Sequence, residues 1–197
     1  MKREWKMLSA MMFGVVLAAG CASTKPMSSA TPIQEFQSPE WVRKGSGASG
    51  SDKGKVFYGV GAASGIRNPS LLRTTADNRA RNDLAKIFQV YTASLMKDYM
   101  GATTANKPGA SSEEQLVEQA MKTVSGMTLS GVEIVDHWQN PATAEFFSLA
   151  RLDLSAFKDS LEKAKELDEK TKEYIRRNSD RLHEKLEKEE KKVNPGN

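Results

Sequence analysis

The residue of this chain best suited to covalent chemistry is Cys21, the only cysteine among 197 residues. It directly follows Leu17-Ala18-Ala19-Gly20, small or aliphatic residues of the kind that a signal peptidase accepts. The sulfur of a cysteine at this place can accept diacylglycerol before the chain is cut ahead of it. The alternative is an ordinary cleavage site that contains a cysteine by chance. Because a lone thiol is unusual in a secreted protein, we predict that Cys21 carries diacylglycerol and an N-acyl chain.

The segment ahead of Cys21 has the layout of a signal peptide. Three basic residues and one acidic residue precede an uncharged run of 13 residues, Met7 to Ala19. This run is shorter than the roughly 20 residues of a membrane-spanning helix, and it has the length of a signal-peptide apolar region. We therefore interpret residues 1–20 as a lipoprotein signal peptide whose end looks like a bacterial lipobox. No aspartate follows the cysteine, which favours sorting to the outer membrane, on its periplasmic face.

The charge of the chain bears on its partners. The full chain has a formal net charge of +4, and residues 1–20 carry +2 of it, so the mature chain keeps +2. Such a small charge predicts no concentrated basic face, and we therefore expect no nucleic-acid partner. Two or more acyl chains anchor a protein stably to a bilayer. The membrane is therefore the first expected partner.

Two segments near the mature N-terminus have loop composition. Residues 21–38 are rich in serine, threonine and proline, which predicts a flexible tether from the lipidated Cys21. About 17 residues of flexible chain span ~20–25 Å, so the folded domain should stay close to the lipid. Glycine and serine dominate Gly45–Gly54, which we expect to be a mobile loop ahead of the first strand.

The chain is organised around a strand, residues 56–63, followed by one long helix that begins near Pro69. Asn68 can cap the first turn of this helix, and proline suits the first helical position. Gly59 and Gly61 do not have the spacing of a dinucleotide fingerprint, so we expect them to let the helix approach the strand closely. One apolar stripe at helical spacing runs along the helix: Leu72, Ala76, Ala80, Leu84, Ile87, Tyr91, Leu95 and Tyr99.

The remaining elements predict an α+β layer fold. Ser111 and Glu114 form a capping box, which opens a helix to about Val124, with Leu116, Val117, Ala120 and Val124 expected to face inward. Strand patterns follow at residues 127–138 and 145–154, with a hairpin turn at residues 139–143. The order β-α-α-β-β-α predicts a three-stranded antiparallel sheet covered by the long helix. We assign residues 39–161 to this domain.

The C-terminal segment, residues 162–197, predicts an extended charged helix and tail. Opposite charges recur four residues apart, as in Glu173–Arg177 and Glu187–Lys191, and such pairs stabilise an isolated helix. Two interpretations remain open. The helix is a solvated spacer, or it pairs with itself or with a partner through its few apolar side chains: Tyr174, Ile175, Leu182 and Leu186.

Few residues fit a catalytic or metal site. His137 beside Asp136 is more typical of a satisfied pair on an edge strand than of a catalytic dyad, and His183 lies in the charged helix. Neither histidine has ligands at metal spacing, and no serine lies in a nucleophile elbow. We therefore expect no enzyme activity, no metal, no cofactor and no small-molecule substrate.

Charged residues of the long helix have a simple interpretation. Arg73, Arg79 and Arg81 have Asp77 or Asp83 one turn away, which predicts ion pairs within the helix. A phosphate- or glycan-binding patch is the alternative.

Several motifs occur together in this chain. Besides the lipobox and Trp138, these are Pro39-Glu40-Trp41-Val42, Phe57-Tyr58-Gly59-Val60-Gly61-Ala62-Ala63, Ala76-Asp77-Asn78-Arg79-Ala80-Arg81 with Leu84-Ala85, Leu129-Ser130-Gly131-Val132, and Phe147-Ser148-Leu149-Ala150-Arg151-Leu152-Asp153. Together they resemble the Lpp-twenty-type outer-membrane lipoprotein family, which includes a flagellar member. The resemblance spans roughly residues 39–161. It implies a small α+β domain with a helix across a three-stranded sheet, no catalytic residues, and a role in the cell envelope, in motility structures or in host contact.

The expected function is therefore that of a non-enzymatic outer-membrane lipoprotein that acts as an assembly or scaffold module, through self-association or an envelope protein partner. One alternative is a lipoprotein regulator of peptidoglycan synthesis, because such activators are also small tethered α/β domains. Another is a ligand-binding domain, which would need a pocket with convergent polar groups.

Overall fold

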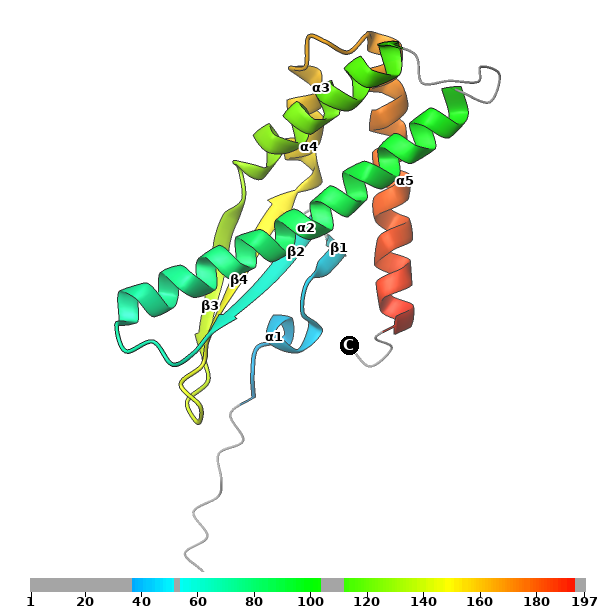
Figure 1. Ribbon diagram of the computed structural model, residues 1–197. Helices are drawn as coiled ribbons and strands as arrows, with labels where there is room; N and C mark the ends of the chain where they lie inside the picture. Colours follow the sequence, from blue (N-terminus) through cyan, green and yellow to red (C-terminus); the bar gives the residue numbers. More distant parts are fainter. Residues whose placement is uncertain (1–36, 52–53, 104–111, 194–197) are drawn as a thin grey trace, which may run out of the picture. The chain divides into compact units, whose positions relative to one another are not determined.

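The computed structural model describes residues 37–51, 54–103 and 112–193, and its class is α+β (Figure 1). Four antiparallel strands form one sheet in the order β1-β2-β4-β3. The strands are β1 (Gly47–Ser51), β2 (Gly54–Ala63), β3 (Glu133–Gln139) and β4 (Phe146–Asp153). The helices are α1 (Glu40–Lys44), α2 (Pro69–Thr103), α3 (Ser112–Leu129), α4 (Leu154–Glu162) and α5 (Glu169–Val193).

Helix α2 confirms the predicted long helix. The side-chain oxygen of Asn68 accepts a hydrogen bond from the backbone N–H of Leu71 at 3.1 Å, so the predicted cap is present. The predicted stripe faces the sheet and the other helices, and six of its members are buried: Leu72, Ala76, Ala80, Leu84, Tyr91 and Leu95. This burial explains why the helix is stable over 35 residues.

Gly59 and Gly61 confirm the predicted close approach of β2 to α2. A Cβ atom on Gly59 would lie 2.5 Å from the backbone nitrogen of Leu84, and one on Gly61 would lie 2.7 Å from the carbonyl carbon of Arg79. Real Cβ atoms do not approach other atoms so closely. The backbone of α2 therefore rests directly on the backbone of β2, and only glycine fits at these two positions.

The predicted three-stranded sheet is wrong in strand number, because β1 lies inside the segment Gly45–Gly54 that we expected to be a mobile loop. Strand β1 pairs with β2, from Gly47 opposite Tyr58 to Ser51 opposite Gly54. A strand made of glycine, serine and one alanine has no alternating apolar pattern, so the sequence gives no signal for it. Its pairing partner and the helix beside it stabilise it instead.

The boundaries around β3 also differ from the prediction. Helix α3 runs on to Leu129, and β3 begins only at Glu133, so the strand is shorter than the predicted segment 127–138. Val117, Ala120 and Val124 are buried as expected, but Leu116 is 62% exposed. Ser111 of the predicted capping box lies outside the described residues.

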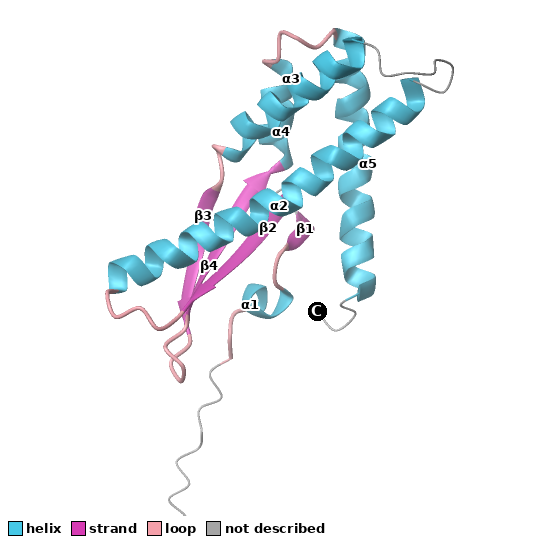
Figure 2. Cartoon of the chain, in the orientation of Figure 1, coloured by secondary structure: helices cyan, strands magenta, loops and turns pink. Residues whose placement is uncertain are grey.

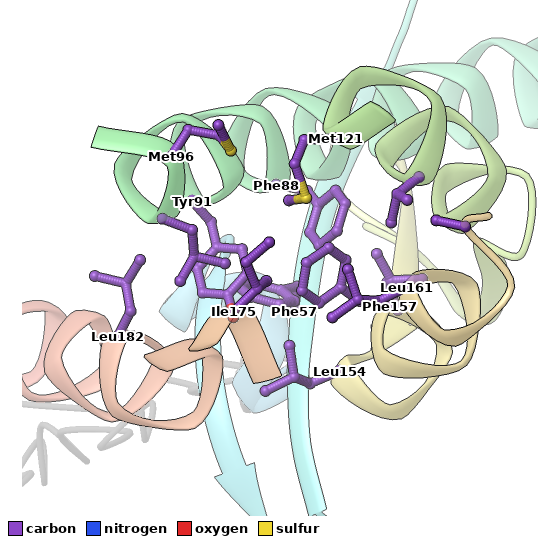
Figure 3. Close-up of a cluster of buried hydrophobic side chains, with 14 of the residues drawn as sticks. Phe57, Phe88, Tyr91, Met96, Met121, Leu154, Phe157, Leu161, Ile175 and Leu182 are labelled. Carbon is purple, nitrogen blue, oxygen red and sulfur yellow. The ribbon is translucent and has the colours of Figure 1, made fainter. Parts of the chain in front are cut away.

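The core is built around a cluster of aromatic rings between α2, β2 and α4 (Figure 3). The ring of Phe57 lies 5.6 Å from that of Phe88 and 4.9 Å from that of Tyr91, and Phe157 meets Phe88 at 5.6 Å. All four side chains are fully buried. The sheet and the helices on this side therefore share one core.

Helix α5 belongs to this same core, which corrects both interpretations of the C-terminal helix. Ile175 is 1% exposed and Leu182 is 8% exposed, while Tyr174 and Leu186 are partly buried against the core. These side chains, predicted as possible partner contacts, therefore contact the chain's own core; Figure 3 shows Ile175 and Leu182 there. Within the described residues, the segment predicted as a separate region from residue 162 is part of one compact unit.

Polar contacts hold α5 to the sheet as well. The side-chain amine of Lys55 lies 3.0 Å from Asp180 and 2.9 Å from Glu184, and Lys158 lies 2.7 Å from Asp180. Two of the predicted pairs within the helix, Glu173–Arg177 at 3.2 Å and Glu187–Lys191 at 2.7 Å, are present. Asp180 and Glu184 instead bind lysines of other elements, Lys55 of β2 and Lys158 of α4.

The two faces of the sheet have different neighbours. Figure 2 shows α2 running across one face, and His137 and Ser148 point to this side because both contact Asp77 of α2. Side chains alternate along a strand, so neighbours of these residues point the other way. We call that side the outer sheet face; it carries Tyr58, Val60, Trp138, Phe147 and Leu149.

Candidate functional site

A polar cluster lies between α2 and the β3–β4 hairpin. One carboxylate oxygen of Asp77 accepts a hydrogen bond from the hydroxyl of Ser148 at 2.7 Å and lies 2.7 Å from Nε2 of His137. The other ring nitrogen of His137, Nδ1, lies 3.2 Å from a guanidinium nitrogen of Arg73. Since arginine can only donate, Nδ1 is the acceptor, and the imidazole donates its Nε2–H to Asp77.

This cluster contains the residue types of a hydrolase triad but not its geometry. In a triad the base takes the proton of the nucleophile, so serine must contact histidine. Here Ser148 is fully buried and its hydroxyl donates a hydrogen bond to Asp77, which stands between it and His137. Burial would raise the pKa of Asp77, but the hydrogen bonds from Ser148 and His137 outweigh it and lower the pKa. The carboxylate therefore stays charged and joins α2 to the sheet.

The predicted pairing of Asp136 with His137 is present only through the backbone. One side-chain oxygen of Asp136 accepts the backbone N–H of His137 at 2.8 Å, and the other accepts the indole N–H of Trp41 at 2.8 Å. The imidazole of His137 instead binds Asp77, far away in the sequence. Sequence spacing could not show this contact, because the fold brings the two residues together.

Most of the charged side chains of α2 contact other elements instead of pairing within the helix, although the charge of Arg81 still helps to lower the pKa of Asp77 one turn away. Arg79 donates to the backbone carbonyl of Ala62 at 2.6 Å, and Arg73 contacts His137. Asp83 accepts a hydrogen bond from the hydroxyl of Ser46, just ahead of β1. These contacts therefore hold α2 against the sheet, and they occupy groups that a phosphate or glycan would need.

A groove of about 410 Å³ lies between α1, β1 and the C-terminal half of α5. Tyr58 and Leu149 of the sheet line it together with Trp41, and two carboxylates, Glu187 and Glu190, line it from α5. Its volume lies in the range of small-molecule sites.

The two carboxylates of the groove bind the free edge of β1. The backbone N–H of Ala48 donates to both oxygens of Glu190, at 3.1 and 2.9 Å, and the backbone of Gly50 hydrogen bonds Glu187. A Cβ on Gly50 would lie 2.9 Å from the Glu187 carboxylate, so glycine gives this side chain its space. Burial raises the pKa of Glu190; the bond from Ala48 opposes this shift, and neighbouring Glu187 adds to it.

His183 is a buried residue that the sequence did not point to. It is fully buried in α5, with Nε2 2.9 Å from the carbonyl of Val56 and its ring 4.9 Å from that of Phe57. Its Nδ1 has no hydrogen-bond partner among the described residues. Burial lowers the pKa of His183, so the imidazole is neutral at pH 7 and serves as packing.

The predicted lipidation site, Cys21 with Leu17-Ala18-Ala19-Gly20, lies outside the described residues. Within the described ranges, no helix is long and apolar enough to cross a membrane. In the same part of the chain, no three histidine, cysteine, aspartate or glutamate side chains are grouped to hold a metal ion.

Comparison with known proteins leaves the family open. No protein-family model matches this chain, and no curated protein matches it significantly. The resemblance to the Lpp-twenty-type lipoproteins therefore stays a prediction from the motifs.

Proposed function

We propose that this protein is a non-enzymatic lipoprotein of the outer membrane whose α+β domain acts as an assembly or scaffold module of the cell envelope. The observation that carries the proposal is the single cysteine, Cys21, placed directly after a short apolar segment and Leu17-Ala18-Ala19-Gly20. The resemblance to the Lpp-twenty-type family points the same way.

The arrangement of the described residues supports a binding role rather than catalysis. Among the described residues, the cluster of Ser148, His137 and Asp77 lacks the geometry of a triad, because the hydroxyl of Ser148 donates its hydrogen bond to Asp77 and not to His137. The first described helix, α1, begins at Glu40, and 18 residues lie between it and Cys21. A domain on such a tether stays close to the lipid and can orient toward envelope partners.

The anchor is tested by the mass and location of the protein in intact cells. We expect the wild-type protein in the outer-membrane fraction, without residues 1–20 and with the added mass of three acyl chains. The variant Cys21→Ser should keep its signal segment or appear in a soluble fraction, without added mass. Wild-type protein that is water-soluble, unacylated and uncut would refute the proposed anchor.

The assembly role is tested by crosslinking in cells that express the acylated wild-type protein. We expect a defined larger species, either a multiple of this chain or a complex with an envelope protein. Recovery of monomer alone, at crosslinker levels that capture a known envelope complex in the same cells, would contradict the assembly role.

A further inference from the structure

We propose that the outer sheet face lies against the surface of the membrane that holds the lipid anchor. This inference rests on the proposed lipidation of Cys21 and adds to it an orientation of the domain. The occupant that it assigns to this face is the interfacial region of a phospholipid bilayer.

The first argument is where the tryptophans lie. The chain has three tryptophans, and Trp5 lies in the predicted signal peptide, so the mature protein keeps Trp41 and Trp138. The indole N–H of Trp41 donates to Asp136, two residues before Trp138 on the same side of β3. Both tryptophans of the mature chain therefore lie on the outer sheet face.

The second argument is the chemistry around these two rings. Trp138 lies 5.5 Å from the ring of Phe147, and both side chains are only partly buried, as are Tyr58 and Val60. Tryptophan and tyrosine prefer the boundary between lipid and water, because each joins an apolar ring to a polar tip. A half-exposed group of this composition suits that boundary.

The opposite side of the domain offers no comparable aromatic group among the described residues of α2, although the outer sheet face also carries the carboxylate of Asp136. The side of α2 that faces away from the sheet exposes mainly polar and charged side chains, among them Asn78, Arg81 and Lys86. Only one large apolar side chain, Val90, is strongly exposed in the middle of this helix. Contact there would remove water from charges and bury little apolar area.

The third argument is where the predicted tether enters the domain. Described structure starts at residue 37 and leads directly into α1, whose Trp41 contacts the outer sheet face. Fifteen residues lie between Cys21 and Gln37, and a flexible chain of this length spans ~19–23 Å. Helix α2 alone is about 52 Å long at 1.5 Å per residue. The entry point therefore places the outer sheet face nearer to the lipid than the far end of the domain.

The test uses the tryptophans themselves as probes. Mature protein extracted from membranes is first weighed by mass spectrometry to establish that Cys21 is acylated, and it is then reconstituted into phosphatidylcholine vesicles with or without brominated acyl chains. Bromine quenches tryptophan only on close approach. We expect brominated vesicles to reduce the emission, and vesicle-bound protein to be less quenched by iodide than the same protein in detergent.

Variants separate the two probes and supply a matched control. Trp41→Phe and Trp138→Phe each leave a single tryptophan, and both remaining probes should be quenched by bromine. A control with both tryptophans replaced by phenylalanine and Gln89→Trp carries its probe on the exposed side of α2. It should be quenched by iodide and not by bromine. The wild-type measurement stands alone if a variant fails to fold, because the mature protein has no other tryptophan.

Each outcome decides the proposal. An unacylated mass refutes the proposed anchor before any fluorescence is measured. If the protein is acylated and its tryptophan emission is quenched by iodide but not by bromine, this face lies in water, which overturns the orientation. Tryptophans that ignore both quenchers are covered by protein, such as a second copy of the chain, which also overturns it.

Discussion

Replacing Gly61 by alanine tests whether the contact between β2 and α2 is as close as described. The new Cβ would meet backbone atoms of Ala76, Arg79 and Ala80, which cannot turn away as a side chain could. To restore ordinary contacts of about 3.5–4.0 Å, the helix must move by roughly 1–2 Å. Such overpacking costs about 1–3 kcal/mol, and the reduced entropy of the unfolded chain returns only about 0.4–1 kcal/mol.

We therefore expect Gly61→Ala to lower the free energy of unfolding by roughly 1–2 kcal/mol, which corresponds to about 2–8 °C in Tm for a chain of this size. Urea unfolding of mature protein with Cys21→Ser, followed by circular dichroism, measures the first quantity, and a thermal scan measures the second. The slope of the urea transition should not change.

Gly126→Ala is the matched control, because the same substitution should there have the opposite sign. Gly126 lies inside α3, and a Cβ on it would meet no atom within 4 Å. Alanine in an open helical position stabilises by about 0.5–1 kcal/mol. If Gly61→Ala were as stable as the wild type, or if both substitutions shifted stability alike, the close contact between β2 and α2 would be refuted.

Three further predictions concern buried groups, all measured by urea unfolding. Leu182→Ala should lower the free energy of unfolding by about 2–5 kcal/mol, because Leu182 lies in the core. A loss below 0.5 kcal/mol, as is usual at the surface, would mean that α5 does not pack on the core. Asp77→Ala should cost about 1–3 kcal/mol because it leaves the buried hydroxyl of Ser148 unpaired, and Asp77→Ala/Ser148→Ala should recover part of this loss. His183 has a pKa below its usual 6.5 in the folded state, so the unfolded chain binds the proton more readily, and stability should fall as the pH drops below about 6.5. His183→Gln, which can still donate to Val56, should remove this part of the pH dependence; equal pH profiles of both proteins would contradict it.

The long helix could be predicted because all its information is local and repeated. Seven steps of three or four residues place the stripe from Leu72 to Tyr99 on one side, and Asn68 with Pro69 fixes its start. The close packing at Gly59 and Gly61 of β2 was predictable for a related reason, since glycine in a strand often marks close approach of another backbone.

Strand β1 and the packing of helix α5 on the core could not be predicted, because what stabilises them comes from distant parts of the chain. The edge of β1 is bound by Glu187 and Glu190, more than a hundred residues away. In α5, the buried side includes Ser179 and His183 beside the apolar residues. Polar residue types at those positions hid the continuous stripe that packs on the core.

The polar cluster was missed for the same reason. Asp77 was assigned to arginines one turn away, whereas its partners His137 and Ser148 come from two strands that follow in the chain. A buried serine and a histidine on one side of a predicted hairpin were the only signal, and it became meaningful only once α2 was placed on the sheet.

The carboxylates on β1 also determine how the sheet ends. Unpaired amides along a border strand are a template on which further strands can add. Ala48 and Gly50 present such amides, and both are occupied by side chains from the last turns of α5. A chain that ends at residue 186 would keep its aromatic core but lose Glu187 and Glu190, the two carboxylates that occupy these amides. Its border strand could then pair with a strand of another copy, so we expect the shortened chain to polymerise rather than to unfold.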